Sequence, residues 1–289
     1  MPRMVSASRT SRIFARLFLY IFVILTLMIT LFPFYWIINM SLQNNIELYK
    51  VPPHFIPKEP TFENFINVFV QERGTMKFYQ AVYNTLIVAV CTMIICIILG
   101  SITGYALARL QFKWGIYFLF VLMGTQMIPP FTDIIPLYVI FSRYLKLVDT
   151  KLALILAYTG WLLPISVWIL YGYFQTIPQN LENAARIDGC TRMQALVRVV
   201  MPLSAPGIAA TAIYGFISST NEFLFAMIFT STAKSKTIPV ALSDMIGKYQ
   251  IQYGDMTAGA VIAAIFPVAL ALLFQKYLVK SLTAGGVKG

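Results

Sequence analysis

Long apolar segments alternate with shorter polar ones along the whole chain. The apolar runs cover 17–40, 81–107, 115–140, 152–174, 207–229 and 258–278. A membrane-spanning helix needs about 20 apolar residues, and each run is close to that length or longer. Because nearly all charged residues fall between the runs, the pattern predicts an all-α polytopic membrane protein. It would have six transmembrane helices in one membrane domain over 17–280.

The composition agrees with this prediction. Apolar residues make up 58% of the 289 residues and charged residues 11%, against about 25% charged in a soluble domain. The net charge of +11 would suit a nucleic-acid-binding protein if the cations were clustered on a soluble face. Here they are scattered between apolar runs, so we expect a lipid membrane as the environment and no nucleic-acid partner.

The first apolar run follows an acid-free segment that contains four arginines: Arg3, Arg9, Arg12 and Arg16. This charge order resembles a signal peptide, but the run exceeds the ~7–15 apolar residues of a signal, and no small-residue cleavage site follows it. We therefore expect an uncleaved first span preceded by a cytoplasmic tail over 1–16. With six spans, the C-terminal tail over 281–289 is cytoplasmic as well.

Pro129-Pro130 interrupts the third run. Residues 115–128 alone give about 21 Å of helix, short of the ~30 Å hydrocarbon core. The run is therefore either a crossing helix that bends at the prolines and continues as an interfacial segment, or a re-entrant loop. The crossing places the polar segment 176–205 in the cytoplasm and makes 231–257 a long external loop.

The polar segment 176–205 has a helix–turn–helix pattern. Pro178 suits the first turn of a short helix, and Gly189 provides its C-terminal stop. Thr191 with Gln194 three residues later is a capping-box pattern for a second helix, which Pro202 ends. The apolar stripe expected on this second helix is Met193, Leu196, Val197, Val200 and Met201.

Three roles suit this element on spacing alone. An amphipathic helix can lie in the lipid interface with its arginines on head groups. It can also dock another protein, because Ala184 and Ala185 give the first helix a flat surface that allows close approach. DNA binding by a helix–turn–helix is the third role, but a loop of ~30 residues tethered at the membrane does not suit binding to DNA.

The same segment resembles the EAA loop of permease subunits from binding-protein-dependent ABC importers. The family pattern is Glu-Ala-Ala, three residues, Gly, nine residues and Ile-x-Leu-Pro, and Asn183 stands here at the glutamate position. The resemblance implies a cytoplasmic coupling helix between spans four and five that inserts into a cleft of an ATPase subunit. The coupling residues it implies are Glu182, Asn183, Ala184, Ala185, Arg186, Asp188, Gly189 and Pro202.

Further stretches resemble the carbohydrate-uptake permeases. Residues 84–90 and 104–109 resemble their second span, 221–226 their fifth, and 282–289 the tail of the maltose-type G subunit. The resemblance implies a pore-forming subunit that imports a sugar or oligosaccharide by alternating access in a bacterial or archaeal cytoplasmic membrane. The implied partners are a second homologous permease subunit, two cytoplasmic ATPase subunits and an external solute-binding protein that the loop 231–257 contacts.

The chain lacks a motif for hydrolysing ATP. No Gly-x-x-x-x-Gly-Lys-Ser/Thr phosphate loop occurs, since Tyr249 follows Gly247-Lys248. The single histidine, His54, excludes a histidine-based catalytic pair, and the three scattered cysteines do not suggest a metal or redox site. We therefore expect no enzyme and no cofactor on this chain, with ATP and Mg on the partner ATPases.

Glu222 is the one acid inside an expected span, where a charge is costly and often functional. It is a candidate for the substrate path with Asn221 and three aromatic residues that could face a sugar, which are Tyr158, Trp161 and Tyr171. Aromatic residues in spans also serve packing and interfacial belts. A secondary transporter and a membrane enzyme are the competing classes, but a solitary acid disfavours an ion relay and one histidine disfavours an enzyme.

Overall fold

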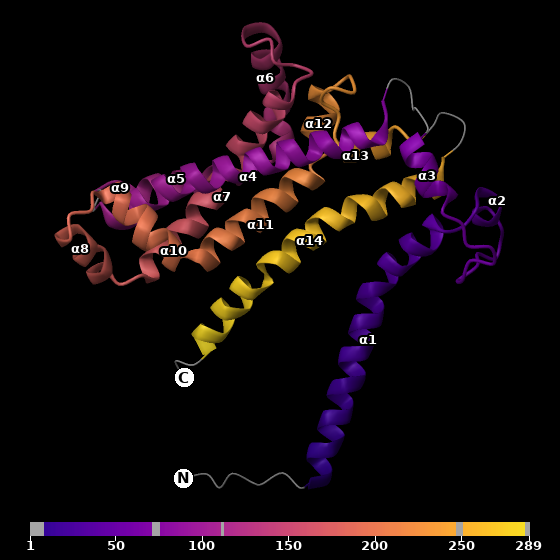
Figure 1. The fold of residues 1–289 in the computed structure, drawn as a ribbon, viewed down its shortest axis with the longest axis horizontal. Coiled ribbons are helices and arrows are strands. Elements are labelled where there is room, and N and C mark those ends of the chain that lie inside the picture. The colour runs from indigo at the N-terminus through magenta and orange to yellow at the C-terminus, as the bar shows by residue number, and fades with distance from the viewer. Residues whose placement is uncertain (1–8, 71–75, 111–112, 247–250, 287–289) are drawn as a thin grey trace. The chain divides into compact units, whose positions relative to one another are not determined.

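The computed structural model describes residues 9–70, 76–110, 113–246 and 251–286, and regular structure in them is helical (Figure 1). An isolated β-bridge pairs Ile246 with Ile251, and no strand forms among these residues. The first eight residues of the expected N-terminal tail and the last three of the C-terminal tail lie outside the described residues. The all-α class predicted from the sequence is confirmed.

The chain divides into two compact units, 1–68 with 252–261 and 69–251 with 262–289. The first unit contains α1 (Arg9–Ser41), α2 (Asn45–Leu48), most of α3 (Glu63–Val70) and the start of α14 (Tyr253–Gly286). The second unit contains the rest of α14 together with α4 (Phe78–Arg109), α5 (Gly115–Thr125), η1 (Pro130–Asp133), α6 (Ile134–Val139), η2 (Ile140–Tyr144), α7 (Lys151–Thr176), α8 (Gln179–Ile187), α9 (Arg192–Ala195), η3 (Leu196–Val200), α10 (Met201–Leu203), α11 (Ala205–Asn221), α12 (Leu224–Phe229) and α13 (Ile238–Ser243).

Four described helices are long and apolar enough to cross a membrane: α1, α4, α7 and α14. Two further apolar stretches are bent pairs of helices. One joins Gly115–Thr125 to Pro130–Tyr144 at 86°, and the other joins Arg192–Leu203 to Ala205–Asn221 at 83°. The expected break at Pro129-Pro130 is therefore present, and the total becomes six if each bent pair makes one crossing.

The fifth apolar run is not one helix, contrary to expectation. Its first part, α11, ends at Asn221, and Glu222 has an extended backbone with φ −71° and ψ 128°. The Glu222 carboxylate accepts hydrogen bonds from the backbone N–H groups of Phe225 at 2.9 Å and Ala226 at 3.2 Å, in the first turn of α12. Free N–H groups at a helix start stabilise a negative charge, so the Glu222 carboxylate caps α12.

The core of the second unit is formed where α4 packs on α7 and α11 packs against both (Figure 1). The crossing of α4 and α7 is close because of Gly100 and Gly104. A Cβ atom at Gly104 would lie 3.0 Å from the Tyr171 backbone nitrogen, and one at Gly100 would lie 3.1 Å from Leu170 Cδ1. These glycines form a G-x-x-x-G pattern, which allows membrane helices to pack backbone against backbone.

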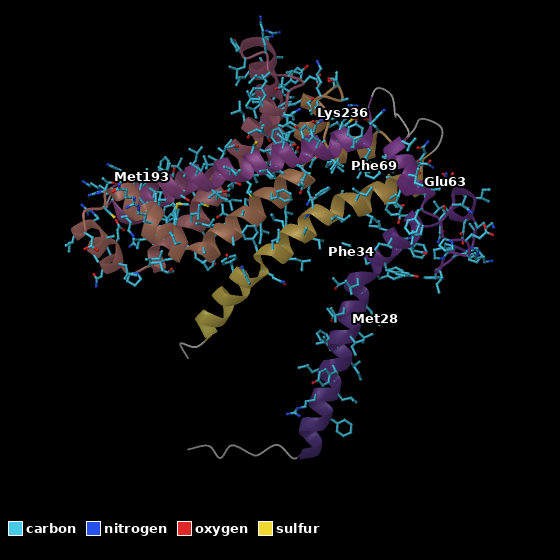
Figure 2. The ribbon with its side chains drawn as sticks, in the orientation of Figure 1. Met28, Phe34, Glu63, Phe69, Met193 and Lys236 are labelled. Carbon is cyan, nitrogen blue, oxygen red and sulfur yellow. The ribbon has the colours of Figure 1, made fainter. Side chains whose placement is uncertain are left out.

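In the first unit, α1 is an apolar helix whose membrane-length window has no buried side chains. Met28 and Phe34, which project from it in Figure 2, are 65% and 58% exposed. The segment after α1 is instead folded by polar contacts. Asn64 donates through Nδ2 to the carbonyls of Ser41 at 2.9 Å and Gln43 at 2.7 Å.

Gly104→Ala is expected to destabilise the protein by about 1–3 kcal/mol, because the added methyl group meets backbone atoms that cannot rotate away. The apparent melting temperature in detergent should fall. Gly172→Ala on the facing helix is the matched control, since a Cβ there meets nothing within 4 Å and alanine favours helix by about 1 kcal/mol. Equal melting temperatures for the two variants would contradict the close crossing.

Candidate coupling site and transport path

The helix α8 ends in the turn that its sequence predicts. Gly189 has φ +92°, a left-handed conformation that glycine adopts without steric cost. The Asp188 N–H donates to the Ala184 carbonyl and the Cys190 N–H to the Ala185 carbonyl, both at 3.0 Å. These bonds satisfy two of the last carbonyls of α8 and reverse the chain direction.

A capping box starts the second helix. The Gln194 N–H donates to Thr191 Oγ1 at 3.3 Å, and the Thr191 N–H donates to Gln194 Oε1 at 2.8 Å. The expected apolar stripe is only partly buried, because Leu196 is buried whereas Met193, labelled in Figure 2, is 53% exposed. The helix passes through Pro202 to Leu203 and then bends, so Pro202 does not end it as expected.

Glu182 anchors α8 to the bundle. Its Oε1 accepts a hydrogen bond from the Tyr105 hydroxyl at 2.5 Å, and its Oε2 lies 3.3 Å from Arg109 Nε. Arg109 also donates through Nη2 to the carbonyls of Phe174 at 2.9 Å and Ile177 at 2.7 Å, at the C-terminus of α7. The side chains of Glu182 and Arg109 are 7% and 8% exposed. One guanidinium group therefore ties α4, α7 and α8 together.

The opposite face of α8 is open to solvent. Asn183 and Ala184 are exposed, and Ile187 is 86% exposed, whereas the exposed Arg186 lies one turn after Glu182 and therefore on the same side of the helix. Glu182, expected among residues that contact an ATPase, instead points inward to its own chain.

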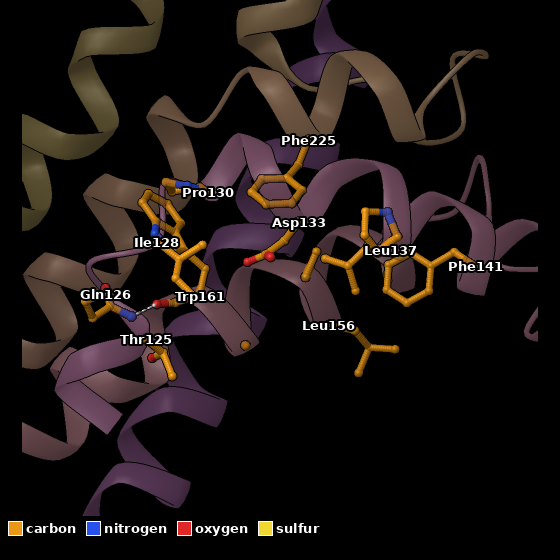
Figure 3. Close-up of a pocket in the computed structure, with 13 residues that line it drawn as sticks. Thr125, Gln126, Ile128, Pro130, Asp133, Leu137, Phe141, Leu156, Trp161 and Phe225 are labelled. Carbon is orange, nitrogen blue, oxygen red and sulfur yellow. Dashed lines mark hydrogen bonds between the residues drawn. The ribbon is translucent and has the colours of Figure 1, made fainter. Parts of the chain in front are cut away.

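A cavity of about 490 Å³ opens at the 86° bend of the third apolar run (Figure 3). Its wall includes Gln126, whose Nε2 donates to the Trp161 carbonyl at 3.1 Å. Figure 3 shows the Asp133 carboxylate directed towards the space between Phe225 and Trp161. Aromatic walls with a few polar groups are typical of small-molecule sites.

Of the five residues expected on a substrate path, Trp161 lines this cavity. Tyr158 is fully buried and packs edge-on against Phe225, with ring centroids 6.3 Å apart. Tyr171 accepts a hydrogen bond from Gln175 at 2.6 Å on α7. Asn221 is exposed at the end of α11, and Glu222 holds the start of α12.

The end of the bundle opposite α8, where α12 and α13 lie in Figure 1, is held by Asp149. Asp149 Oδ1 accepts hydrogen bonds from the Ser231 N–H at 2.8 Å, the Thr232 N–H at 2.9 Å and the Ser235 hydroxyl at 2.5 Å. Burial alone would raise the pKa of Asp149, but the bonds from Ser235, Ser231 and Thr232 hold that pKa well below its ordinary value. The carboxylate is therefore ionised and fixes the start of the loop.

Lys151 and Asn84 add to this attachment. Lys151 Nζ donates to the Lys234 carbonyl at 2.8 Å, while Asn84 Nδ2 donates to the carbonyls of Ala233 at 2.9 Å and Lys236 at 3.0 Å. The first part of the segment 231–257 is thus bonded to the ends of α4 and α7.

Comparison with known proteins identifies the family. Residues 96–284 match the model of the binding-protein-dependent transport system inner membrane component. The chain belongs to this family. It is therefore the permease component of an ABC importer, and neither a secondary transporter nor an ATPase.

Relatives match this permease over nearly its whole length. The trehalose/maltose transport system permease protein MalG of Thermococcus litoralis is 36% identical over 275 residues, covering 95% of this chain and 97% of the relative. The sulfoquinovosyl glycerol transport system permease protein SmoH of Agrobacterium fabrum is 37% identical, covering 90% and 89%. The trehalose transport system permease protein SugB of Mycobacterium tuberculosis is 35% identical, covering 90% and 93%.

A solved structure shares the fold. It is a bacterial ABC transporter involved in the import of the acidic polysaccharide alginate, with a TM-score of 0.75 and 22% identity, covering 96% of this permease and 99% of that chain.

Sequence reasoning assigned no role to Tyr105, Arg109 or Asp149. Tyr105 and Arg109 lie in a stretch that resembles the family's second span. Their spacing of four residues places them on one helix face, and this spacing could have indicated a shared partner. Asp149 had no such signal, because its partners lie more than 80 residues away.

Glu182→Gln is expected to loosen α8, because the ion pair with Arg109 is lost while the side-chain shape is kept. Hydrogen exchange of the α8 amides in the intact permease should accelerate roughly thirtyfold, the equivalent of about 2 kcal/mol for a bond to a charged group. Asp188→Asn, which removes an exposed acid from the end of the same helix, should leave the exchange unchanged. Unchanged exchange in Glu182→Gln would disprove the anchor.

Proposed function

We propose that this permease imports a sugar or oligosaccharide delivered by an external solute-binding protein, together with a second permease subunit and two ATPase subunits. The relatives named for trehalose/maltose, trehalose and sulfoquinovosyl glycerol support a carbohydrate substrate. A related ABC transporter was solved with an alginate pentasaccharide-bound periplasmic protein, which supports delivery from outside. The observation that carries the proposal is the solvent-exposed α8 held rigidly by Arg109.

The coupling step uses the exposed face of α8. A rigid helix transmits a push better than a flexible loop, and Arg109 fixes α8 to both α4 and α7. Asn183, Ala184 and Ile187 would fit a cleft of an ATPase subunit, with the two small or polar side chains allowing close approach. Asn183 would accept or donate a neutral hydrogen bond there, about half as strong as one to a glutamate.

The energy source lies on the partner subunits. ATP and Mg would bind there, and closure of the two ATPases would displace α8 and switch the cavity between inward- and outward-facing states. This mechanism requires that α8 and both termini lie in the cytoplasm. It also requires that the chain cross the cytoplasmic membrane six times. The four long helices and two bent pairs support that arrangement.

The cavity at the bend forms part of the substrate path in this proposal. Trp161 and Phe225 would offer apolar faces to a sugar ring, while Gln126 and Asp133 would bond to its hydroxyl groups. On the outer side, the segment attached to Asp149 would contact the solute-binding protein, since its anchored start fixes where the rest of 231–257 emerges.

Ile187→Glu is expected to reduce co-purification of the ATPase subunits about tenfold or more, because it introduces a charge into the one large apolar side chain of the proposed docking face. Ile66→Glu is the matched control, since Ile66 is also an exposed isoleucine in a helix. Its side chain, on α3, is 59% exposed, and that of Ile187 is 86% exposed. Retention of the ATPase by Ile187→Glu at the control level would refute docking through α8.

Trp161→Ala should lower ATP-driven sugar uptake into proteoliposomes roughly fivefold, the equivalent of about 1 kcal/mol for one aromatic contact. Trehalose and maltose are the first sugars to test. Trp168→Ala removes an exposed tryptophan from the same helix outside the cavity, and uptake should remain normal. Equal uptake by both variants would exclude the cavity from the path.

A further inference from the structure

A second, smaller cavity of about 220 Å³ lies beside the anchor of α8. It is distinct from the cavity at the bend and lies between the C-terminal end of α4, α8 and the start of α9. Its lining residues are polar apart from one leucine, and they are Arg109, Leu110, Gln179, Glu182, Asn183, Arg186 and Arg192.

The charge of this cavity favours an anion. Three guanidinium groups face one carboxylate, which leaves a net charge of two positive. The Glu182 carboxylate is already engaged by Tyr105 and Arg109. Arg186 and Arg192 form no ion pair with any acid in the described part of the chain, so both are available to a ligand.

The surroundings of the cavity are those of a membrane surface. The helix α4 has 32 residues and is about 48 Å long, so its ends extend beyond the ~30 Å hydrocarbon core into the headgroup layer. Leu110 at the rim is 42% exposed. Trp114 and Tyr117 follow it, with ring centroids 5.5 Å apart, and both are about 60% exposed, as in an interfacial aromatic belt.

We propose that this cavity binds the phosphate of an anionic phospholipid headgroup from the leaflet on the α8 side. Arg186 and Arg192 would form charge-assisted hydrogen bonds to the phosphate oxygens, and the amide group of Gln179 would donate a further bond. The lipid tails would leave past Leu110 towards Trp114. Basic pockets at this depth between membrane helices suit such headgroups.

A lipid fits better than a soluble anion because Leu110, the one apolar lining residue, is 42% exposed and is followed along the chain by the exposed Trp114 and Tyr117. It also fits better than an acidic side chain of a partner, because the arginines lie next to the helix end that enters the headgroup layer. A bound lipid would brace α8 through Arg186, on the side of the helix that carries Glu182.

Native mass spectrometry of the intact transporter complex tests the proposal. The detergent-solubilised complex is titrated with phosphatidylglycerol, and in parallel with phosphatidylcholine, which has no net charge. The wild-type complex should retain phosphatidylglycerol preferentially. The double variant Arg186→Gln/Arg192→Gln should bind it roughly thirtyfold more weakly, since each arginine near a lipid surface contributes about 1 kcal/mol. Arg198→Gln, an exposed arginine of η3 outside the cavity, is the control and should bind as wild type does.

Three outcomes would overturn the proposal. The double variant could bind phosphatidylglycerol like the control, which would exclude the cavity. Inorganic phosphate could displace the lipid at equal concentration, which would indicate a site for free phosphate. The double variant could keep the lipid but lose the ATPase, which would assign the arginines to an acidic side chain of that subunit. Lipid retention is measured without transport, so its result is independent of the proposed sugar import.

Discussion

The Arg109 guanidinium is the constraint on which the arrangement of the second unit depends. It bonds to the carbonyls of Phe174 and Ile177 at the end of α7 and pairs with Glu182 of α8. Free carbonyls at a helix C-terminus stabilise a cation, so Arg109 satisfies that helix end and the carboxylate at once. Removal of either Arg109 or Glu182 would leave the other nearly buried charge unpaired, which is why α8 is held as one body with α4 and α7.

The membrane environment explains where the backbone is broken. Peptide groups freed by a helix break must find partners inside the protein, since lipid offers none. The Glu222 carboxylate accepts hydrogen bonds from the N–H groups at the start of α12. Pro130 has no backbone N–H, so the break there leaves one donor fewer that needs a partner. Both breaks border the larger cavity through Phe225 and Pro130. These two breaks in the helical backbone therefore lie beside the same cavity.

The sequence predicted the helical class, which depends on local apolar periodicity. It also predicted the break at Pro129-Pro130 and the Gly189 turn with the Thr191 cap, because each depends on the local backbone or hydrogen-bonding properties of these residues. It failed at Glu222, where apolar periodicity continues across a helix break that a side-chain cap makes possible. The role of Glu182 was missed for another reason. Its direction depends on Tyr105 and Arg109, 77 and 73 positions earlier, and local patterns do not report such contacts.

The helix α7 joins the two ends of the second unit. Its C-terminal carbonyls hold Arg109, Trp161 lies on the larger cavity near its middle, and Lys151 at its start bonds to the Lys234 carbonyl. A helix of 26 residues is a stiff element about 39 Å long. A tilt imposed through α8 must therefore move the cavity wall and the attachment of the segment 231–257 together. In the proposed mechanism, energy released on a partner subunit needs only this one packed helix to change access to the cavity.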